Sequence, residues 1–451
     1  MSAGDLSGIS GAVMTSPATW YHARLGARRP RPELEGRVAV RFAVVGGGLA
    51  GLATALSLAE RGAEVALLEA VELGFGASGR NGGMASAGFT RPVDELLRRY
   101  GREHARALHA ASREGLALLR RRIARYRIAC DLVEGVVEAS WFDDAEAMAR
   151  EARMLNEEFG MRVECWPREK VRAIWRSARY YEAIFDPEGF HLDPLRLLFG
   201  YAEAAEARGV RIFECSPAER IRRRGAGFEI QTRKGRILAE AVILCPSVYG
   251  DPCDRRLARG LLAVASYVIV TEPLGERLAR VIGAPYAVFD DRMATGYYRP
   301  LPEGRLLWGG RVSLFERRSR EALERIMRRD LASVYPELAG VGVAYAWSGR
   351  MGFARHKMPV VRELEPGLWT ATAFGGHGLN TTTMAGELVA RALLEGDDRW
   401  RLFAPFALPW VGDGLGRLLA QGYYLFFALE DRIRAGWSAW RASSNRRAGP
   451  L

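Results

Sequence analysis

Apolar runs and amphipathic segments alternate in the first part of the chain. Residues 41–45 form a short run rich in valine, which predicts a buried parallel strand. Residues 52–61 have the apolar spacing and the residue types of a helix, and Gly62 marks the end of that helix. A second apolar run, residues 65–68, predicts the next strand. The pattern predicts a strand–turn–helix–strand unit of an open α/β sheet.

A glycine-rich turn joins the first predicted strand to its helix. Residues 46–51 read GGGLAG and contain the GxGxxG pattern of dinucleotide-binding turns. The first glycine permits a tight turn, the second lets a pyrophosphate approach the backbone, and the third lets the helix pack closely on the strand. The free amides and the dipole of the helix N-terminus favour a phosphate at the same place. The candidate cofactor contacts in this turn are Gly46, Gly48, Leu49, Ala50 and Gly51.

An acidic residue follows the second predicted strand. Glu69 lies about 20 residues beyond the last glycine of the turn, where dinucleotide-binding proteins place the acid that accepts hydrogen bonds from a ribose. A GxGxxG alone is also compatible with an ordinary glycine-rich turn, but the strand before it and the acid after it favour a dinucleotide site. Glu69 and its neighbour Ala70 are therefore candidate cofactor contacts. The unit alone does not distinguish NAD from FAD.

A second glycine-rich segment, residues 76–84, begins where the chain leaves the carboxyl end of the second strand. Ligands of open α/β sheets bind at that edge. A long polar loop at this place can wrap a second phosphate and reach a flavin ring, which favours FAD. A surface loop rich in turn residues is the alternative. The candidate cofactor contacts in this segment are Ser78, Gly79, Arg80, Asn81, Gly82, Gly83 and Met84.

A third glycine-rich turn lies more than 300 residues further along the chain. Residues 368–373 predict a strand, and residues 375–380, GGHGLN, open a helix that continues to residue 394. The amides and dipole of this helix would stabilise negative charge, as on a reduced flavin. For His377, packing beside the turn and a chemical role are equally favoured. The candidate cofactor contacts here are Gly376, Gly378, Leu379 and Asn380.

The intervening sequence predicts mixed structure. Residues 92–127 have the apolar spacing of one long helix. Residues 218–239 predict a short antiparallel meander, and residues 261–314 a β-rich piece with a hairpin around the turn at 302–304. Tyr297, Tyr298, Arg299 and Arg350 are candidates for contact with substrate in this region, although sheet packing is an equal alternative for the tyrosines.

Composition narrows the class of protein. The chain has 451 residues, 49% of them hydrophobic, and a net charge of +12, which by itself would permit contact with nucleic acid or with an anionic membrane. Almost all of the excess is arginine scattered along the helices, so we expect no nucleic-acid partner. The five cysteines are dispersed without a CxxC pair, and the histidines lack ligand spacing, which predicts no metal site and a reducing compartment.

The two ends of the chain differ from the middle. No apolar run has the length of a signal peptide core or a membrane helix, so we expect a cytoplasmic protein without an integral membrane segment. Trp20 and Tyr21 stand in an otherwise polar arm, which predicts that the arm docks as a packing anchor; a substrate contact is the alternative. Residues 418–440 predict an aromatic amphipathic helix packed on the surface, with membrane contact as the alternative.

The three glycine-rich turns together resemble those of the FAD-dependent D-amino-acid oxidase family, which includes glycine and sarcosine oxidases. The Trp20–Tyr21 arm, the run at residues 77–83 and the turn at 375–379 are most similar to those of gamma-glutamylputrescine oxidase-like members. The resemblance implies an α/β fold with a Rossmann-like FAD-binding domain and a discontinuous substrate domain built on an antiparallel sheet. The implied segments are an arm at 1–36, an FAD-binding domain at 37–95, 186–257 and 345–400, a substrate or cap domain at 96–185 and 258–344, and a helical tail at 401–451.

The resemblance also implies how the cofactor is held. A further cofactor contact is implied at residue 218, in the turn formed by Pro217 and Ala218. Sarcosine-oxidase-like members attach the flavin to a cysteine near residues 347–359, and this chain has none there, so noncovalent FAD is expected. Many relatives have Ala-Thr-Gly or a similar sequence after a later sheet strand, where this chain has Cys245-Pro246-Ser247.

The implied activity is oxidation of the C–N bond of an amine or amino acid by hydride transfer to the flavin, giving an imine that water hydrolyses. Oxygen is the expected acceptor. Sarcosine-oxidase-like members place a lysine that promotes reaction with oxygen where this chain has Leu307 or Trp308, so a dehydrogenase serving a quinone or carrier protein is the alternative. A flavin-binding protein without turnover is a third possibility. The catalytic candidates are His377, Arg350 and Tyr298, with Arg350 one place from the arginine that binds a substrate carboxylate in glycine-oxidase-like members.

Overall fold

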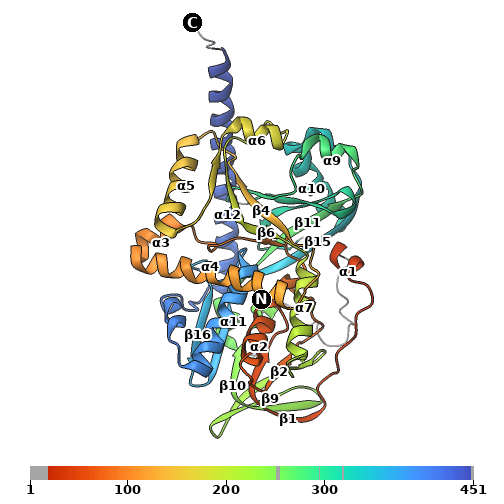
Figure 1. Ribbon diagram of the computed structural model, residues 1–451, viewed down its shortest axis with the longest axis vertical. Helices are drawn as coiled ribbons and strands as arrows, with labels where there is room; N and C mark the ends of the chain where they lie inside the picture. Colours follow the sequence, from red (N-terminus) through yellow and green to blue (C-terminus); the bar gives the residue numbers. More distant parts are fainter. Residues whose placement is uncertain (1–18, 250–253, 294, 317–318, 448–451) are drawn as a thin grey trace.

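The computed structural model describes residues 19–249, 254–293, 295–316 and 319–447, and side chains up to residue 438. Two β-sheets organise this part of the chain, one in the lower half of Figure 1 and one in the upper half. The first is mainly parallel and the second mainly antiparallel. The predicted α/β class, with a Rossmann-like domain and an antiparallel-sheet domain, is confirmed.

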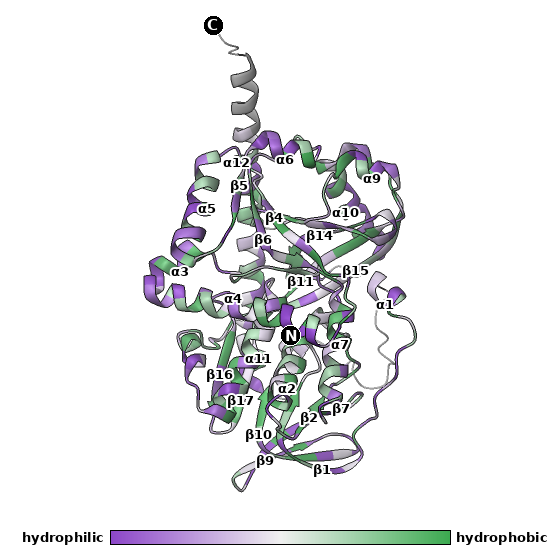
Figure 2. Cartoon of the chain, viewed as in Figure 1, coloured by the Kyte–Doolittle hydropathy of each residue, from purple (hydrophilic) through white to green (hydrophobic). Residues whose placement is uncertain are grey.

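Within the described residues the first sheet has eight strands, six of them in the order β16–β17–β10–β1–β2–β7. The strands β17, β10, β1, β2 and β7 run parallel, β16 is antiparallel to β17, and a β8–β9 hairpin continues from β10. Figure 2 shows the short buried strand β2 in the green of apolar residues. The bounds are β1 (Gly36–Val45), β2 (Val65–Leu68), β7 (Arg211–Phe213), β8 (Arg220–Arg224), β9 (Gly227–Gln231), β10 (Gly235–Leu244), β16 (Val360–Glu365) and β17 (Leu368–Thr372).

The carboxyl ends of the parallel strands meet at one edge of this sheet. Val45, the last residue of β1, lies in register between Leu68 of β2 and Leu244 of β10. Leu244 in turn pairs with Thr370, near the end of β17. The predicted turns that follow β1, β2 and β17 therefore leave the sheet on the same side, where ligands of open α/β sheets bind.

Three helices cover one face of the sheet: α2 (Leu49–Ala59), α7 (Pro194–Glu206) and α11 (Gly378–Glu395). Helix α4 (Arg102–Arg125) packs on α11. Every residue of α2 is buried, as its nearly continuous apolar sequence requires. α2 and α11 cross closely, because a Cβ at Gly386 would lie 2.6 Å from the amide nitrogen of Thr54. The two helices that begin at glycine-rich turns are thus packed directly on each other.

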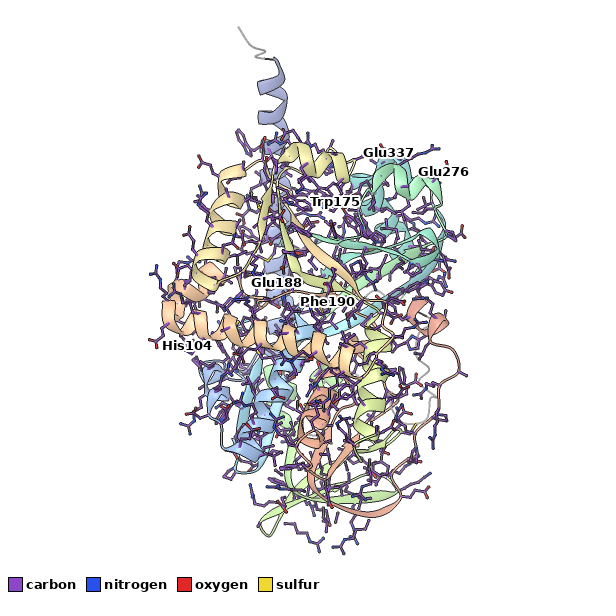
Figure 3. All side chains as sticks on the ribbon, in the orientation of Figure 1. His104, Trp175, Glu188, Phe190, Glu276 and Glu337 are labelled. Atoms are coloured by element: carbon purple, nitrogen blue, oxygen red, sulfur yellow. The ribbon has the colours of Figure 1, made fainter. Side chains whose placement is uncertain are left out.

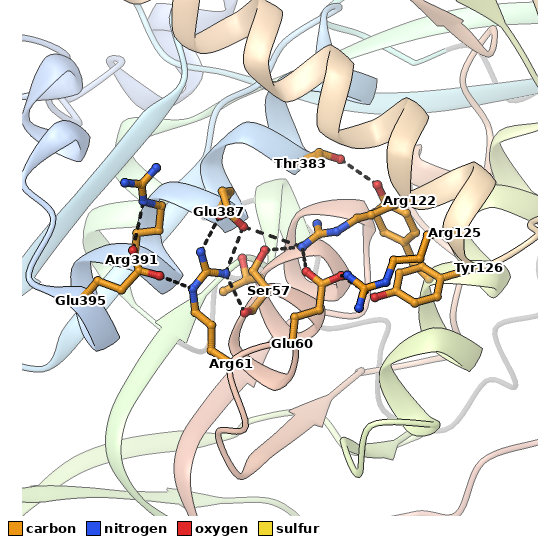
Figure 4. Close-up of polar contacts among 12 residues, drawn as sticks. Ser57, Glu60, Arg61, Arg122, Arg125, Tyr126, Thr383, Glu387, Arg391 and Glu395 are labelled. Atoms are coloured by element: carbon orange, nitrogen blue, oxygen red, sulfur yellow. Dashed lines mark hydrogen bonds and ion pairs between the residues drawn. The ribbon is translucent and has the colours of Figure 1, made fainter.

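A network of ion pairs fixes these helices at the end remote from the turns (Figure 4). Arg122 of α4 is 1% exposed and donates from Nη2 to Ser57 Oγ at 2.7 Å and to Glu60 Oε2 at 2.5 Å. Arg61 donates to Glu387 of α11 at 2.6 Å. Since these charges are paired inside the protein, separating the helices would leave a buried charge without a partner.

The second sheet has nine strands among the described residues, eight of them in the order β15–β11–β14–β13–β12–β4–β6–β3, and β5 pairs with β6. The predicted hairpin is present as β13 and β14, joined at Pro302–Gly304. The predicted domain limits at residues 186 and 345 fall inside β6 and β15. The bounds are β3 (Met84–Ala85), β4 (Val133–Ala139), β5 (Glu164–Trp166), β6 (Ala183–His191), β11 (Leu262–Thr271), β12 (Ala287–Asp290), β13 (Tyr297–Leu301), β14 (Arg305–Ser313) and β15 (Val343–Phe353).

The outer face of the second sheet has its own aromatic core. Trp308 stacks on Tyr298 at 5.0 Å between ring centroids, and Tyr335 packs edge-on against both. Trp175 lies in the same cluster, beneath α6 in Figure 3. The covering helices are α6 (Arg168–Ile174), α9 (Glu276–Val281) and α10 (Arg320–Val334).

The predicted single helix at residues 92–127 is wrong in one respect. The structure has two helices, α3 (Val93–Tyr100) and α4, divided at Gly101. Gly101 has a φ of +80°, a conformation that glycine adopts without strain, and it lets the chain change direction between the helices. The helical spacing continues through the break, so periodicity alone did not reveal it.

The remaining helices include both ends of the described chain. They are α1 (Trp20–Leu25), α5 (Ala145–Phe159), α8 (Arg255–Gly260) and α12 (Asp413–Arg447). Within the described ranges, every helix is too short or too polar to cross a membrane.

Candidate active site

The first glycine-rich turn is shaped by two close backbone contacts. A Cβ at Gly51 would lie 1.9 Å from the carbonyl oxygen of Gly46. Gly46 itself has a φ of +108°, and a Cβ there would lie 2.6 Å from the carbonyl oxygen of Cys245. Helix α2 therefore approaches the end of β1 as closely as the motif predicts.

The N-terminus of α2 already holds an oxygen atom. Gly48 is the N-cap and provides no side-chain cap, so the first amides of the helix remain available to other groups. The Leu49 amide donates to Ser78 Oγ at 3.0 Å. This contact joins the first turn to the second glycine-rich segment and shows that the helix end accepts an oxygen ligand.

Glu69 lies beside the first turn, as the sequence predicts. Its Oε2 accepts from the amide of Gly47 at 2.7 Å, and its Oε1 accepts from the amide of Val71 at 3.0 Å. Burial raises the pKa of Glu69 above its ordinary value. Each oxygen keeps a further lone pair that a ribose hydroxyl could use. Ala70 is exposed next to Glu69, whereas Ala218, in the neighbouring turn, is buried in the core of the first sheet.

The second glycine-rich segment is folded around the side chain of Asn81. Its amide nitrogen donates to the carbonyl oxygens of Ala77 and Ser78 at 3.2 and 3.0 Å, and its Oδ1 accepts from the amide of Gly83 at 2.9 Å. Asn81 therefore fixes the loop from within. Of the other candidates here, Gly79 is buried against the carbonyl of Gly74 and Met84 pairs with His191 at the edge of the second sheet.

Two distant residues hold this segment from outside. Tyr21 of α1 is fully buried and donates its hydroxyl to the carbonyl oxygen of Asn81 at 2.8 Å. Arg299 of β13 is 3% exposed and donates to the carbonyl oxygens of Gly82 at 2.7 Å and Leu192 at 2.9 Å. The arm therefore docks as a packing anchor, as predicted. Arg299 binds backbone oxygens, which corrects its expected place on the substrate face.

Arg80 carries an unsatisfied nitrogen in this part of the protein. Its Nε is buried without a hydrogen-bond partner, and its guanidinium lies over the ring of Phe75 at 5.0 Å. Burial lowers the pKa of Arg80. Trp347 of β15 donates its indole N–H to the carbonyl oxygen of Arg80 at 2.9 Å. A buried cation with a free donor fits a polar or anionic ligand.

The third glycine-rich turn is joined to the second segment. His377 is the N-cap of α11, and its Nε2 lies 3.0 Å from the carbonyl oxygen of Ser86. Burial lowers the pKa of His377, so the ring is neutral near pH 7. Asn380, expected near the cofactor, instead donates its side-chain amide to Ser112 Oγ of α4 at 2.8 Å. Of the remaining candidates, Leu379 is buried and Gly376 is exposed.

A family model described as FAD dependent oxidoreductase matches residues 41–392, which is more than half of the chain. The chain belongs to the D-amino-acid oxidase (DAO) family of FAD-dependent oxidoreductases. The sequence-based assignment to this family is thus confirmed, and the expected cofactor, noncovalent FAD, is typical of the family.

Individual relatives agree with this assignment. The chain is 35% identical to gamma-glutamylputrescine oxidoreductase of Escherichia coli (strain K12), over 92% of this chain and 98% of the relative. It is 33% identical to the probable oxidoreductase OrdL of Haemophilus influenzae, over 85% of this chain and 90% of the relative. Among solved structures, glycine oxidase from Geobacillus kaustophilus has the same fold, with a TM-score of 0.69 at 22% identity, covering 82% of this chain and 99% of that chain.

The residues of this DAO-family enzyme fit FAD. The α2 N-terminus that begins at Gly48 suits the pyrophosphate, and Glu69 stands where an adenosine ribose would meet it. The free Nε of Arg80 offers a donor to a further polar group of the cofactor. These assignments to individual FAD groups remain predictions. Across the described ranges, the structure places no group of three or more His, Cys, Asp or Glu side chains that could hold a metal ion.

Adjacent tyrosines of β13 face opposite sides of the second sheet. The ring of Tyr297 lies against Gly82 and Gly309, where a Cβ would come within 2.6 and 2.1 Å of it. Tyr298 points the other way, and its hydroxyl lies 2.7 Å from that of Tyr335 in the outer aromatic core. The expected contact of Tyr298 with substrate is therefore corrected, and Tyr297 is the member of the pair that faces the glycine-rich segment.

Arg350 of β15 is paired within the protein. Its Nε donates to Glu316 Oε2 at 2.7 Å, and Ser348 donates its hydroxyl to the same carboxylate. The Arg350 side chain is 39% exposed. It lies near the site, because Arg80 donates to the carbonyl oxygen of Ser348 at 3.4 Å.

Sequence reasoning did not single out Phe75 and Tyr249. Their rings pack edge-on at 6.0 Å, and Phe75 also underlies Arg80. Tyr249 ends the short 3-10 helix Ser247–Tyr249 that follows β10, and a Cβ at Gly76 would lie 3.3 Å from its ring. An aromatic residue close after a strand that ends at the binding edge was the available signal.

Proposed function

We propose that this FAD-dependent oxidoreductase oxidises the C–N bond of an amine or amino acid to an imine, which water then hydrolyses. The names of relatives support an amine donor, since the Escherichia coli protein is called a gamma-glutamylputrescine oxidoreductase. Oxygen is the proposed acceptor. A small-molecule amine is therefore the proposed partner of the site.

The observation that carries the proposal is that the side chains proposed to face the amine, unlike Arg80, are neutral or paired. Burial lowers the pKa of His377 and raises the pKa of Tyr297, so both are uncharged near pH 7. The charge of Arg350 is balanced by Glu316. Such surroundings favour an amine in its deprotonated form, because burial disfavours the ammonium ion. A deprotonated amine is the form that loses a hydride most readily.

FAD, when bound, supplies the redox chemistry by accepting the hydride from the carbon next to the nitrogen. The protein orients the amine and excludes water. Tyr297, Trp347 and Leu307 present an apolar surface of the second sheet toward the glycine-rich segments. The amides at the start of α11, from Gly378 onward, stabilise negative charge there, and we propose that the neutral ring of His377 holds this turn against Ser86.

We propose that Arg350 binds an anionic group at the far end of the substrate. It is half-buried and lies near Arg80 through the backbone of Ser348. When the substrate anion replaces Glu316 as the partner of Arg350, Glu316 would be released to solvent or to another cation. An amine without such a group would leave the Arg350–Glu316 pair in place.

A dehydrogenase that passes electrons to a quinone or carrier protein is the second candidate. Leu307 is fully buried among the apolar side chains of the sheet face that meets the nucleotide-binding half. Leu307 or its neighbour Trp308 corresponds to the lysine that promotes reaction with oxygen in the sarcosine-oxidase-like members that the sequence resembles. A site without that cation favours an acceptor other than oxygen.

The test is anaerobic mixing of the FAD-loaded enzyme with a panel of amines and amino acids, followed by mixing of the reduced enzyme with oxygen. Bleaching of the flavin absorption by an amine supports the proposed donor, and failure of the whole panel would leave a flavin-binding protein without this activity. Fast reoxidation by oxygen supports an oxidase. Slow reoxidation by oxygen together with fast reoxidation by a soluble quinone identifies the dehydrogenase.

A further inference from the structure

Helix α12 presents a continuous row of large apolar side chains to solvent. We call this row the outer stripe. Its members lie between 45% and 68% exposed and recur mostly at spacings of three and four, which places them on one side of the helix. The members are Leu415, Leu418, Leu419, Tyr423, Leu425, Phe426, Leu429, Ile433 and Trp437.

The opposite side of α12 is fixed to the second sheet along most of its length. Gln421 accepts from the amide of Leu314 at 3.0 Å, and Asp431 accepts from the amide of Met293 at 3.1 Å. Ser438 accepts from the amide of Asp143 at 3.1 Å. Tyr424 packs in a small apolar cluster with the sheet. These contacts determine which side of the helix faces out, so the outer stripe is not the product of a freely rotating helix.

The outer stripe is larger than an ordinary apolar patch. It extends over 22 residue steps from Leu415 to Trp437, or about 33 Å of helix. With nine large side chains at roughly half exposure or more, its area is on the order of 1,000 Å², against about 300–600 Å² for the largest patch of a typical monomer. Trp410 and Phe315, 57% and 46% exposed, adjoin it. A surface of this size indicates an interaction partner.

The rim of the outer stripe is positively charged. Between Leu415 and Trp437 the arginines at the rim are Arg417 and Arg432, against one exposed acid, Glu430. The other two charged side chains of this stretch contact the rest of the protein, since Arg434 lies over the ring of Phe142 at 3.9 Å and Asp431 accepts from the Met293 amide. Exposed Arg417 lies over the ring of Phe315 at 5.2 Å, and Lys357 over the ring of Tyr423 at 5.3 Å. The partner must therefore offer apolar surface bordered by negative charge.

A second copy of the chain is a poor match for this surface. It would bring the same positive rim, and the whole chain carries a net charge of +12. The repulsion between two such rims opposes pairing of the stripes. A bilayer containing anionic lipids has both features that the stripe requires of a partner, since apolar acyl chains lie beneath a layer of negative headgroups.

We propose that α12 docks this enzyme on the surface of an anionic lipid bilayer. The outer stripe enters the boundary between headgroups and acyl chains, and the arginines along its rim meet the lipid phosphates. Trp410 and Trp437 stand near the two ends of the stripe, and tryptophan is enriched at this depth of a membrane. The helix lies along the bilayer without crossing it. If the enzyme is cytoplasmic, as the sequence predicts, it would meet the anionic cytoplasmic leaflet.

The test is co-sedimentation of the full-length, FAD-loaded enzyme with lipid vesicles. We expect binding to vesicles of phosphatidylglycerol mixed with phosphatidylcholine, and at least about tenfold weaker binding to phosphatidylcholine alone or in high salt. The triple variant Leu418→Ser, Phe426→Ser, Leu429→Ser should lose at least about tenfold in binding to the mixed vesicles. Its flavin spectrum and unfolding temperature should match those of the parent, because these side chains face solvent.

Paired charge variants separate electrostatic attraction from apolar insertion. Arg432→Gln removes a positive charge at the rim and should weaken binding to the mixed vesicles, whereas the matched control Glu430→Gln removes a negative charge and should not. Equal binding to neutral and anionic vesicles, or binding by the triple variant within about twofold of the parent, would overturn the proposal. A dimer in solution that the triple variant abolishes, in a protein that binds no vesicle, would assign the stripe to a second copy and overturn it as well.

Discussion

Replacing Gly51 with alanine should weaken FAD binding more than it weakens folding. The added Cβ would lie 1.9 Å from the Gly46 carbonyl oxygen, whereas ordinary contact begins at 3.4 Å. Because the obstacle is backbone rather than a flexible side chain, α2 has to retreat from β1 by about 1.5 Å. The retreat carries the amides at the start of α2 away from the place proposed for the pyrophosphate.

The magnitude follows from two opposing effects on stability and one on binding. Overpacking of this kind costs about 1–3 kcal/mol, and alanine in place of glycine within a helix returns up to about 1 kcal/mol. The net loss in free energy of unfolding is therefore about 2 kcal/mol or less. Weakening of two charge-assisted hydrogen bonds to phosphate removes about 3 kcal/mol from binding, which corresponds to about 100-fold in the Kd for FAD.

The assay is a titration of the apoprotein with FAD followed by flavin fluorescence, combined with unfolding in urea. Gly422→Ala is the matched control, since it also replaces a helical glycine but meets open space. The control should bind FAD like the parent and be as stable or slightly more stable. If Gly51→Ala bound FAD within about threefold of the parent, the assignment of the α2 N-terminus to the pyrophosphate would be refuted.

Four other substitutions test separate parts of the account. Arg299→Lys removes the fork that holds the Gly82 carbonyl, so FAD should dissociate at least about tenfold faster in stopped-flow release, and an unchanged rate would contradict the clamp. Arg350→Met should raise KM for substrates that carry a carboxylate by about tenfold or more and leave KM for simple amines within about twofold; an equal change for both would reject the proposed contact. Burial lowers the pKa of His109 to about 4, against 6.5 when unfolded, so the unfolded state takes up the proton first and stability falls by up to about 3 kcal/mol as pH drops from about 6.5 to about 4. His109→Leu should flatten that slope in urea unfolding, and a parallel slope would exclude His109 as its source. Tyr298→Phe should lower the free energy of unfolding by about 1 kcal/mol without changing FAD affinity, because the Tyr298 hydroxyl bonds that of Tyr335 in the outer core. A changed FAD affinity would show that Tyr298 does contribute to the site.

Local sequence patterns were sufficient for the nucleotide-binding unit. The strand, turn and helix at residues 41–61 are adjacent in the chain. Their glycines are required by close backbone contacts between residues near in sequence, such as Gly46 and Gly51. The three glycine-rich turns were each found in the same way. Their meeting at one edge followed from the rule for parallel strands, and the contacts of Leu49 with Ser78 and of His377 with Ser86 agree with it.

Contacts between residues far apart in the chain could not be predicted from the same local patterns. Strand alternation shows that Tyr297 and Tyr298 face opposite sides, but only the pairing of β13 with β14 decides which side meets the glycine-rich segment. Arg299 binds the Gly82 carbonyl from more than 200 residues away, so its role depends on the assembled fold. The hydrogen bond from Asn380 to Ser112 likewise depends on the assembled fold, because it forms where α4 packs beside α11.

The central claim is that the glycine-rich turns at residues 46–51, 76–84 and 375–380 together hold one FAD. The most direct measurement is the visible absorption spectrum of the purified, folded chain before and after incubation with FAD and removal of the unbound cofactor. The account predicts a yellow protein with the absorption of flavin in a ratio of about one FAD per chain. A folded protein that stays colourless after this treatment would contradict it.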